Sequence, residues 1–275
     1  MANDTWTERI LRTTEYIHGH LGEEVDPATL ASIACFSLHH FHRVFRGIVG
    51  ESVMEYTRRL RLEQAAVRLK FDKEPVTGIA LRSGYDSHEG FTRAFTARFG
   101  VSPSEFRSQS QPLPEEKPGF ETRHYLAIRC LAVRHTGPYP ECGPAWQKLF
   151  GWVMPRRIPV RLDQPTFGLV YDDPEITAPA HCRFDACVML AGDADPTGLP
   201  EGFFLRTIPE GTYAQALHCG PYDSILATYV ALLGEWLPRR GVELPDEPVI
   251  EAYLNNPLQT KPADLRTEVR ARIRE

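Results

Sequence analysis

The sequence lacks any apolar run long enough to cross a membrane. No stretch approaches the roughly 18 consecutive apolar residues that a membrane helix needs. The amino-terminal segment, MANDTWTERI, contains neither a basic stretch nor the apolar core of a secretion signal. We therefore expect a cytoplasmic protein with no membrane partner.

The sequence also lacks cysteine pairs at the close spacing of zinc sites. Its six cysteines are dispersed, and in a reducing compartment we expect free thiols. They are Cys35, Cys130, Cys142, Cys182, Cys187 and Cys219. Cys35 and His39 stand at positions i and i+4 and could share a metal ion, but no further ligands converge on them in the sequence. No metal or other cofactor is expected.

Proline is scarce over residues 1–108, which hold only Pro27, Pro75 and Pro103. Because helices tolerate proline poorly, this region can be nearly all helical, whereas the remainder must consist of short elements and turns. Basic and acidic side chains balance in residues 1–108, and the acidic excess of the chain lies in residues 109–275. The proline-rich stretch 109–119 has the composition of a semi-rigid linker. We predict two domains, 1–108 and 120–275, joined by this linker.

The first region repeats itself at a constant interval. The matching residues are Ser37, Phe41, Arg43, Phe45, Gly50 and Ser52, which fall on Ser87, Phe91, Arg93, Phe95, Gly100 and Ser102. Each copy predicts a helix-turn-helix whose second helix has a serine N-cap and an inward aromatic stripe. The apolar spacing from Ser52 to about Phe71 predicts one long helix between the copies. We therefore predict an all-α domain of two helix-turn-helix motifs joined by a long helix.

The second helix of such a motif offers its outer face to the DNA major groove. The side chains predicted on these faces are His39, His42, Arg43 and Arg46 in the first copy and His88, Glu89, Thr92 and Arg93 in the second. Between His39 and Lys70, basic residues outnumber acidic ones by seven to three, a local excess that favours phosphate contact. We expect Arg58, Arg59 and Arg61 to form a solvated face with some phosphate contact.

Residues 5–107 resemble the DNA-binding domain of the AraC/XylS family of bacterial transcription regulators. The resemblance is carried by the second copy, IALRSGYDSHEGFTRAFTARFGVSPSEFR, over residues 79–107. It implies two helices that enter successive major-groove segments of promoter DNA. It also implies base contacts at His39, His42, Arg43, His88, Glu89 and Arg93. Because histidines occupy several of these positions, the preferred bases do not follow from the resemblance. We expect RNA polymerase as a further partner.

The second region contains a repeat of its own. His135–Tyr139, HTGPY, falls on His218–Tyr222, HCGPY, and at the same offset Trp146 falls on Tyr229. The pattern predicts helices over 141–154 and 223–237, with strands over 166–171, 181–190, 249–254 and 267–273. Each half then reads strand, helix, strand, strand. Two such halves predict an α+β domain, an antiparallel sheet with helices on one face.

Residues 120–275 resemble the GyrI-like small-molecule-binding domain. The resemblance is carried by the two Gly-Pro-Tyr turns and by YDDP, IPEGTY and VIEAYL, which begin at 171, 208 and 249. In ligand-binding relatives the acidic residue of the last motif meets cationic, lipophilic compounds, which implies this role for Glu251. The HxGPY histidines are expected to brace their turns.

Glu251 also stands out on physical grounds, because it lies between Ile250 and Ala252 in an apolar strand. A buried charge costs several kcal/mol unless it is paired, so this carboxylate either points to solvent or receives a cation. The expected walls of such a site are aromatic, since ring faces attract cations. They are Tyr139, Trp146, Tyr222 and Tyr253. For Trp146 and Tyr229, core packing and ligand contact remain equally open.

Together these features predict a ligand-responsive transcription regulator that binds promoter DNA and senses a small, cationic, lipophilic effector. The alternative is a small-molecule hydrolase fused to a DNA-binding module, in which Glu251 activates water. No serine or cysteine nucleophile stands in a recognisable setting.

Overall fold

The computed structural model describes residues 6–71, 74–109, 119–242 and 247–273. The chain divides into two compact units, Met1–Pro112 and Leu113–Glu275. The predicted linker, 109–119, falls almost entirely outside the described residues.

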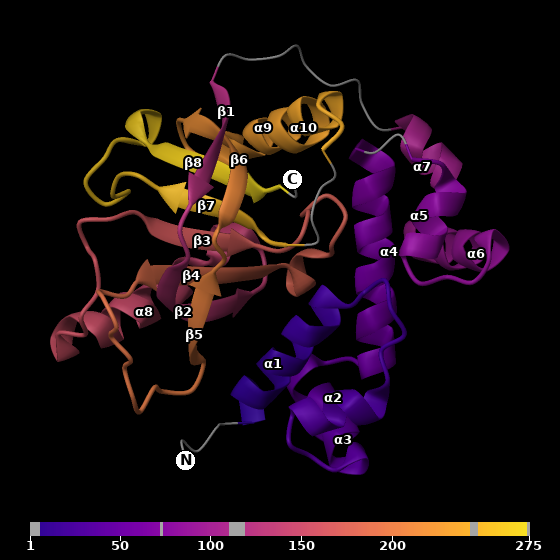
Figure 1. Cartoon of the computed structure of the whole chain (residues 1–275), viewed down its shortest axis with the longest axis horizontal. Coiled ribbons are helices and arrows are strands. Elements are labelled where there is room, and N and C mark those ends of the chain that lie inside the picture. The colour runs from indigo at the N-terminus through magenta and orange to yellow at the C-terminus, as the bar shows by residue number, and fades with distance from the viewer. Residues whose placement is uncertain (1–5, 72–73, 110–118, 243–246, 274–275) are drawn as a thin grey trace. The chain divides into compact units, whose positions relative to one another are not determined.

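The first unit is helical throughout its described residues. Its helices are α1 (Trp6–Gly19), α2 (Pro27–Ile33), α3 (Leu38–Val49), α4 (Val53–Phe71), α5 (Val76–Arg82), α6 (His88–Phe99) and α7 (Pro103–Gln109). The pairs α2–α3 and α5–α6 are the two predicted helix-turn-helix motifs. Figure 1 shows α4 as the long helix that connects them. The predicted all-α fold is confirmed.

The two copies share their helix ends as well as their sequence. Gly50 and Gly100 end α3 and α6 in the left-handed conformation, with φ of 87° and 78°, which glycine adopts without strain. Ser37 and Ser87 occupy the predicted N-cap positions, but only the Ser87 side chain accepts a bond, from the Gly90 amide at 3.1 Å. The helices that follow, α4 and α7, open with matching capping boxes, in which Ser52 pairs with Glu55 and Ser102 with Glu105.

Aromatic pairs form the core of both motifs. The rings of Phe41 and Phe45 are 5.5 Å apart in the first motif, and those of Phe91 and Phe95 are 5.5 Å apart in the second. All four side chains are fully buried. The i, i+4 spacing places each pair on one face of its helix, so the opposite face is left to solvent.

The second unit is built on one eight-stranded antiparallel sheet. Its strands are β1 (Phe120–Tyr125), β2 (Ile128–Thr136), β3 (Thr166–Val170), β4 (Arg183–Met189), β5 (Phe203–Ile208), β6 (Gly211–Cys219), β7 (Val249–Tyr253) and β8 (Arg266–Arg272). Their order in the sheet is β1-β6-β8-β7-β3-β4-β2-β5. The predicted α+β fold is confirmed.

The duplication extends over the whole unit. The offset that carries His135 onto His218 also carries the bounds of β1, β2, β3 and β4 onto those of β5, β6, β7 and β8. Each half has one strand more than the sequence pattern predicted, because β1 and β5 precede the strands that lead to the HxGPY turns. Only two residues separate β1 from β2, and the same is true of β5 and β6, so each pair reads as one continuous segment in the sequence.

The sheet is strongly bent. Since the three Cα–Cα steps from Tyr125 to Ile128 reach at most about 11 Å, β1 at one edge and β2 near the other can be consecutive only if the edges approach each other. Figure 1 shows β1 and β5 running across the direction of β3 and β7. The bend encloses an apolar cluster on one face, which includes Phe167, Tyr213 and Ile250.

Helices cover the other face of the sheet, as predicted. In the first half α8 (Gly143–Arg156) packs on β2 and β4 through Leu149 and Val153. In the second half the predicted single helix is interrupted. It consists of α9 (Ile225–Tyr229), the π-helical segment η4 (Val230–Trp236) and α10 (Leu237–Arg239). Leu232 and Trp236 of η4 pack on β6 and β8. Short 3-10 turns complete the unit at Tyr139–Glu141, Pro179–His181, Tyr222–Ser224 and Pro262–Asp264.

All six cysteines are free thiols. Within the described ranges, no helix has both the length and the apolar character needed to cross a membrane. In the same ranges, no group of three or more acidic, cysteine or histidine side chains is placed to hold a metal ion.

Candidate functional site

The helix α3 presents its predicted reading residues to solvent. Phe41, Val44 and Phe45 form its buried stripe. All four predicted readers are exposed, namely His39, His42, Arg43 and Arg46. A helix that enters the major groove needs this arrangement, with one face held by the protein core and the other able to reach base edges.

The helix α6 repeats this arrangement with one difference. His88, Glu89 and Arg93 are exposed, as predicted. Thr92 is half-buried, and its hydroxyl oxygen is buried with no hydrogen-bond partner. Thr92 precedes the buried Phe95 by three residues, so the two side chains lie on neighbouring parts of the helix surface. Thr92 therefore lies at the edge of the buried stripe. The predicted outward position of Thr92 is therefore wrong.

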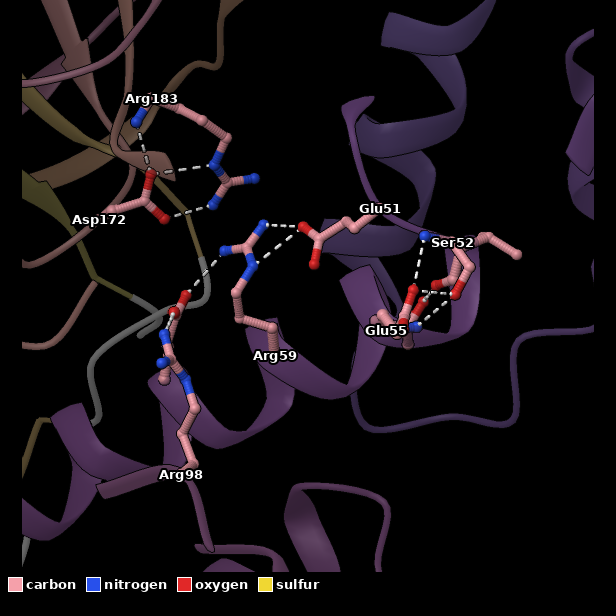
Figure 2. A network of polar contacts seen from close by, with 10 residues as sticks. Glu51, Ser52, Glu55, Arg59, Arg98, Asp172 and Arg183 are labelled. Carbon is pink, nitrogen blue, oxygen red and sulfur yellow. Dashed lines mark hydrogen bonds and ion pairs between the residues drawn. The ribbon is translucent and has the colours of Figure 1, made fainter. Parts of the chain in front are cut away.

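The basic face predicted on α4 also differs from expectation. Arg58 is exposed, but Arg59 is only 9% exposed and its guanidinium contacts the carboxylates of Glu51 and Glu63 (Figure 2). Arg61 is half-buried and donates to the Leu21 carbonyl at 2.8 Å. Only Arg58 is thus solvated as predicted. Burial alone would lower the pKa of Arg59, but the hydrogen bond from Arg59 to Glu51 and the charge of Glu63 raise it.

In the second unit, Glu251 lies on the helix-covered face of the sheet. It is paired in register with Val269 of β8, which packs under η4. The residue is only 9% exposed. The Tyr229 hydroxyl donates to one carboxylate oxygen at 2.7 Å, and the Tyr253 hydroxyl donates to the other. The carboxylate is therefore buried and does not point to solvent.

Aromatic rings surround this carboxylate. The Tyr253 ring contacts the Trp146 ring at 5.7 Å and the Tyr222 ring at 5.6 Å, both edge to face. We call Trp146, Tyr222, Tyr229 and Tyr253 the aromatic cluster. Tyr222 is 37% exposed and Trp146 is half-buried, so the cluster connects the buried carboxylate with the surface.

Tyr139 does not share these contacts. Its hydroxyl donates to the Asp172 carbonyl at 2.7 Å and accepts from the Asp172 amide at 3.0 Å. Its ring contacts Phe184 instead. Tyr139 thus braces the chain after β3, whereas Tyr229, for which two roles remained open, touches Glu251 directly. The repeat relates Tyr229 to Trp146, which was an expected wall of the site. This equivalence was the signal in the sequence that could have placed Tyr229 in the site.

Burial raises the pKa of Glu251, although the hydrogen bonds from Tyr253 and Tyr229 and the charge of His218 act in the opposite direction. Burial and then the charge of Glu251 raise the pKa of Tyr229 and of Tyr253 well above their usual range. The same two causes raise the pKa of Tyr222 to about 12. The hydroxyls therefore stay protonated and donate, while the carboxylate gains from any positive charge that reaches it.

The equivalent of Glu251 in the first half is Gly168, and the two residues face each other in the register of β3 and β7. A Cβ atom at residue 168 would lie 2.6 Å from both the Tyr253 hydroxyl and the Phe184 ring. These side chains occupy the space that a second carboxylate would need. The site therefore has one acidic residue at the centre of a duplicated fold.

The hydrogen bonds to the Glu251 carboxylate come from tyrosines and not from the HxGPY histidines. The Nε2 atoms of His135 and His218 lie 3.0 Å and 3.1 Å from the carbonyls of Pro138 and Pro221. Both rings thus close their turns in the same way, as predicted.

Comparison with protein families gives two matches. Residues 116–274 match the family described as GyrI-like small molecule binding domain. Residues 30–109 match the family described as helix-turn-helix domain. The two resemblances found in the sequence are confirmed.

Among curated proteins, the helical region is similar to transcription regulators. It is 33% identical over 103 residues to the uncharacterized HTH-type transcriptional regulator YbfP of Bacillus subtilis, a match that covers 38% of this chain and 35% of that protein. It is 33% identical over 96 residues to the transcriptional regulator Rob of Salmonella typhimurium, with coverage of 35% and 33%. The chain thus spans about a third of the length of these relatives.

Among solved structures, the chain resembles the protein in the cryo-EM structure of the EcmrR-DNA complex in EcmrR-RPo. The TM-score is 0.50 at 14% sequence identity, and the likeness covers 91% of this chain and 100% of that one. At this identity the likeness shows the fold alone. Because the GyrI-like match extends over more than half of its residues, the chain belongs to the family of the GyrI-like small molecule binding domain, with a helix-turn-helix domain ahead of it.

Proposed function

We propose that this chain is a one-component transcription regulator whose GyrI-like domain binds an organic cation at Glu251. The observation that carries the proposal is the setting of this carboxylate. It is buried under aromatic rings, it is held by two tyrosine hydroxyls, and no lysine or arginine among the described residues forms an ion pair with it. A hydrophobic cation supplies the missing charge, and the rings add cation–π attraction of about 0.5–2 kcal/mol each.

The DNA-binding part of the proposal rests on the exposed faces of α3 and α6. We assign base contacts to His39, His42, Arg43, His88, Glu89 and Arg93, with the exposed Arg46 on the same face of α3. Two reading helices in one chain suit an asymmetric site with two major-groove segments on one side of the duplex. Promoter DNA and RNA polymerase are the proposed macromolecular partners, and the proposed domains are 1–108 and 120–275.

The test uses the full chain and two compounds of the same shape. Phenyltrimethylammonium carries a permanent charge, and tert-butylbenzene is its neutral isostere. We expect calorimetric titration to detect the cation, and thermal unfolding to shift upward with its concentration. Equal binding of both compounds would remove the cation assignment.

The hydrolase alternative has its own outcome. A panel of esters and amides with cationic groups is incubated with the protein, and products are followed by mass spectrometry. Ligand recovered intact supports a sensor. Turnover that disappears in Glu251→Gln would replace the sensing proposal with an enzyme in which this carboxylate activates water.

A further inference from the structure

An ion network crosses the first unit from the end of α3 to α6 (Figure 2). Glu51, directly after the Gly50 cap of α3, accepts from Arg59 of α4 at 2.6 Å and 3.0 Å. The next turn of α4 carries Glu63, which accepts from Arg59 at 3.0 Å and from Arg98 of α6 at 2.9 Å. We call Glu51, Arg59, Glu63 and Arg98 the α4 network.

The centre of the α4 network is buried. Glu63 is 4% exposed and Arg59 is 9% exposed, while the Arg98 side chain is 33% exposed. Two carboxylates meet two guanidinium groups, so the charges balance. Apolar residues of similar volume are often as stabilising as a buried ion pair, so stability alone does not account for these residues. What an ion network adds is a fixed geometry, because each guanidinium binds only in its own plane.

A second set of contacts links the turn between α1 and α2, through α4, to the second motif. Arg61 of α4 donates to the Leu21 carbonyl between α1 and α2, and its guanidinium lies beside Gly84 of the second motif, 2.9 Å from where a Cβ would stand. In the same way, a Cβ at Gly22 would lie 2.9 Å from the Arg82 carbonyl. Gly22 thus allows the turn between α1 and α2 to approach the end of α5, and Gly84 allows the turn before α6 to approach Arg61 of α4.

We propose that Glu63 and Arg98 are positioning residues that fix α6 relative to α3, so that the unit reads two major-groove segments at a single spacing. The inference rests on the proposed DNA-binding function. Arg98 acts through Glu63 and not through the bases, since it lies in the last turn of α6, at the opposite end of the helix from His88. Its loss should therefore change the tolerated spacing and leave the preferred bases unchanged.

The experiment begins with duplexes selected by the full chain from a random-sequence library. From the selected duplex we derive one with a single base pair inserted between the protected segments, which shifts the second segment by about 3.4 Å and a tenth of a turn. A third duplex has its second segment scrambled. Fluorescence anisotropy gives the Kd for each.

We expect Arg98→Ala, which leaves the Arg59 and Glu63 pair intact, to weaken binding to the selected duplex by about 5- to 10-fold. Binding to the scrambled duplex should be unchanged, and the loss caused by the inserted base pair should be smaller than in the wild type. Arg98→Lys should restore part of the loss. Arg93→Ala is the matched control, and it should relax base preference in the second segment.

Two results overturn the inference. If Arg98→Ala keeps the wild-type ratio of affinities between the selected and the inserted duplex, the residue does not set the spacing. If it loses affinity equally on all three duplexes, it acts on the fold of the whole unit, and a matching fall in its thermal midpoint would show this. Failure of the wild type to select any duplex would instead refute the DNA-binding function itself.

Discussion

The substitution Glu251→Gln tests the ligand site most directly, because it keeps the side chain's shape and removes its charge. In the free protein the carboxylate accepts from Tyr229 and Tyr253, and the amide can still accept one of these bonds. The hydroxyl of the other tyrosine can accept from the amide nitrogen. We therefore expect the variant to fold and the aromatic cluster to keep its contacts.

The magnitude follows from burial. With only 9% of the residue exposed, water screens the carboxylate poorly, and loss of a desolvated ion pair costs about 2–5 kcal/mol. This corresponds to a rise in Kd of about 30-fold to 4,000-fold for phenyltrimethylammonium. For tert-butylbenzene the expected change is less than about threefold, since the substitution removes a charge and retains the shape of the site. Calorimetric titration of both proteins with both compounds gives the four constants.

The pH dependence provides an independent check on the same residue. Burial raises the pKa of Glu251 in the folded state, so its ionisation weakens the fold. The stabilisation that protonated Glu251 contributes to the free energy of unfolding is fully present below the pKa that this residue has in the unfolded chain. This stabilisation is lost as the pH rises through the pKa that Glu251 has in the folded protein. The affinity for the cation should change in the opposite direction, because binding needs the ionised carboxylate. We expect this affinity to increase as the pH rises through the folded pKa of Glu251. Glu251→Gln should lose both dependences.

Equal loss of affinity for the cation and for its neutral isostere would refute the reasoning, since it would show that the substitution damages the shape of the site. An unchanged Kd for the cation would refute it more simply. A pH profile of cation binding that survives in the variant would assign the titration to another group.

Three further predictions concern the readers, the glycine opposite Glu251 and the domain boundary. Arg43→Ala and Arg93→Ala should each cost about 1–3 kcal/mol on a selected duplex and relax base preference, whereas Arg58→Ala should weaken all sequences alike; equal losses on selected and random duplexes for all three would contradict the assignment. Gly168→Ala should destabilise the chain by about 1–3 kcal/mol by overpacking against Tyr253 and Phe184 and weaken cation binding. The control Gly151→Ala, in α8 with no atom within 4 Å of the added Cβ, should be neutral or slightly stabilising in the same denaturant titration. Cleavage within 109–119 should leave two folded pieces, of which 1–108 still binds DNA in an anisotropy assay, and an unfolded fragment would refute the independence of the domains.

The helical unit was predictable from the sequence because its signals are local. Serine caps, glycine ends and aromatics at i and i+4 lie within each helix, so α4 begins directly after its predicted start at Ser52 and ends at its predicted end, Phe71. The burial of Arg59 was not predictable in this way. Its partner Glu51 lies outside the helix that carries it, and a row of arginines on a helix is typical of a solvated face.

For the sheet unit, the sequence predicted the duplication and the central strands. The separation of β1 from β2 was missed because it depends on pairing partners elsewhere, β6 for one strand and β4 with β5 for the other. The π-helical segment was missed as well, and its Leu232 and Trp236 pack on β6 and β8, which come from other parts of the chain. Glu251 stood out by its apolar neighbours, but Tyr229 comes from a separate helix earlier in the chain, and only the folded arrangement brings the two together.

The duplication itself explains why the site has a single charge. The offset between the two halves relates Gly168 to Glu251, and the sheet register pairs these same two residues, so the pseudo-twofold axis of the unit passes between them. A symmetric pair of glutamates would place two like charges side by side in a buried setting, which is strongly unfavourable. Glycine on one side removes the second charge, and the Tyr253 hydroxyl and Phe184 ring occupy the space it leaves. We therefore expect the centre of the sheet to neutralise one positive charge for each chain, because the duplicated scaffold departs from symmetry at this one residue and so carries a single carboxylate there.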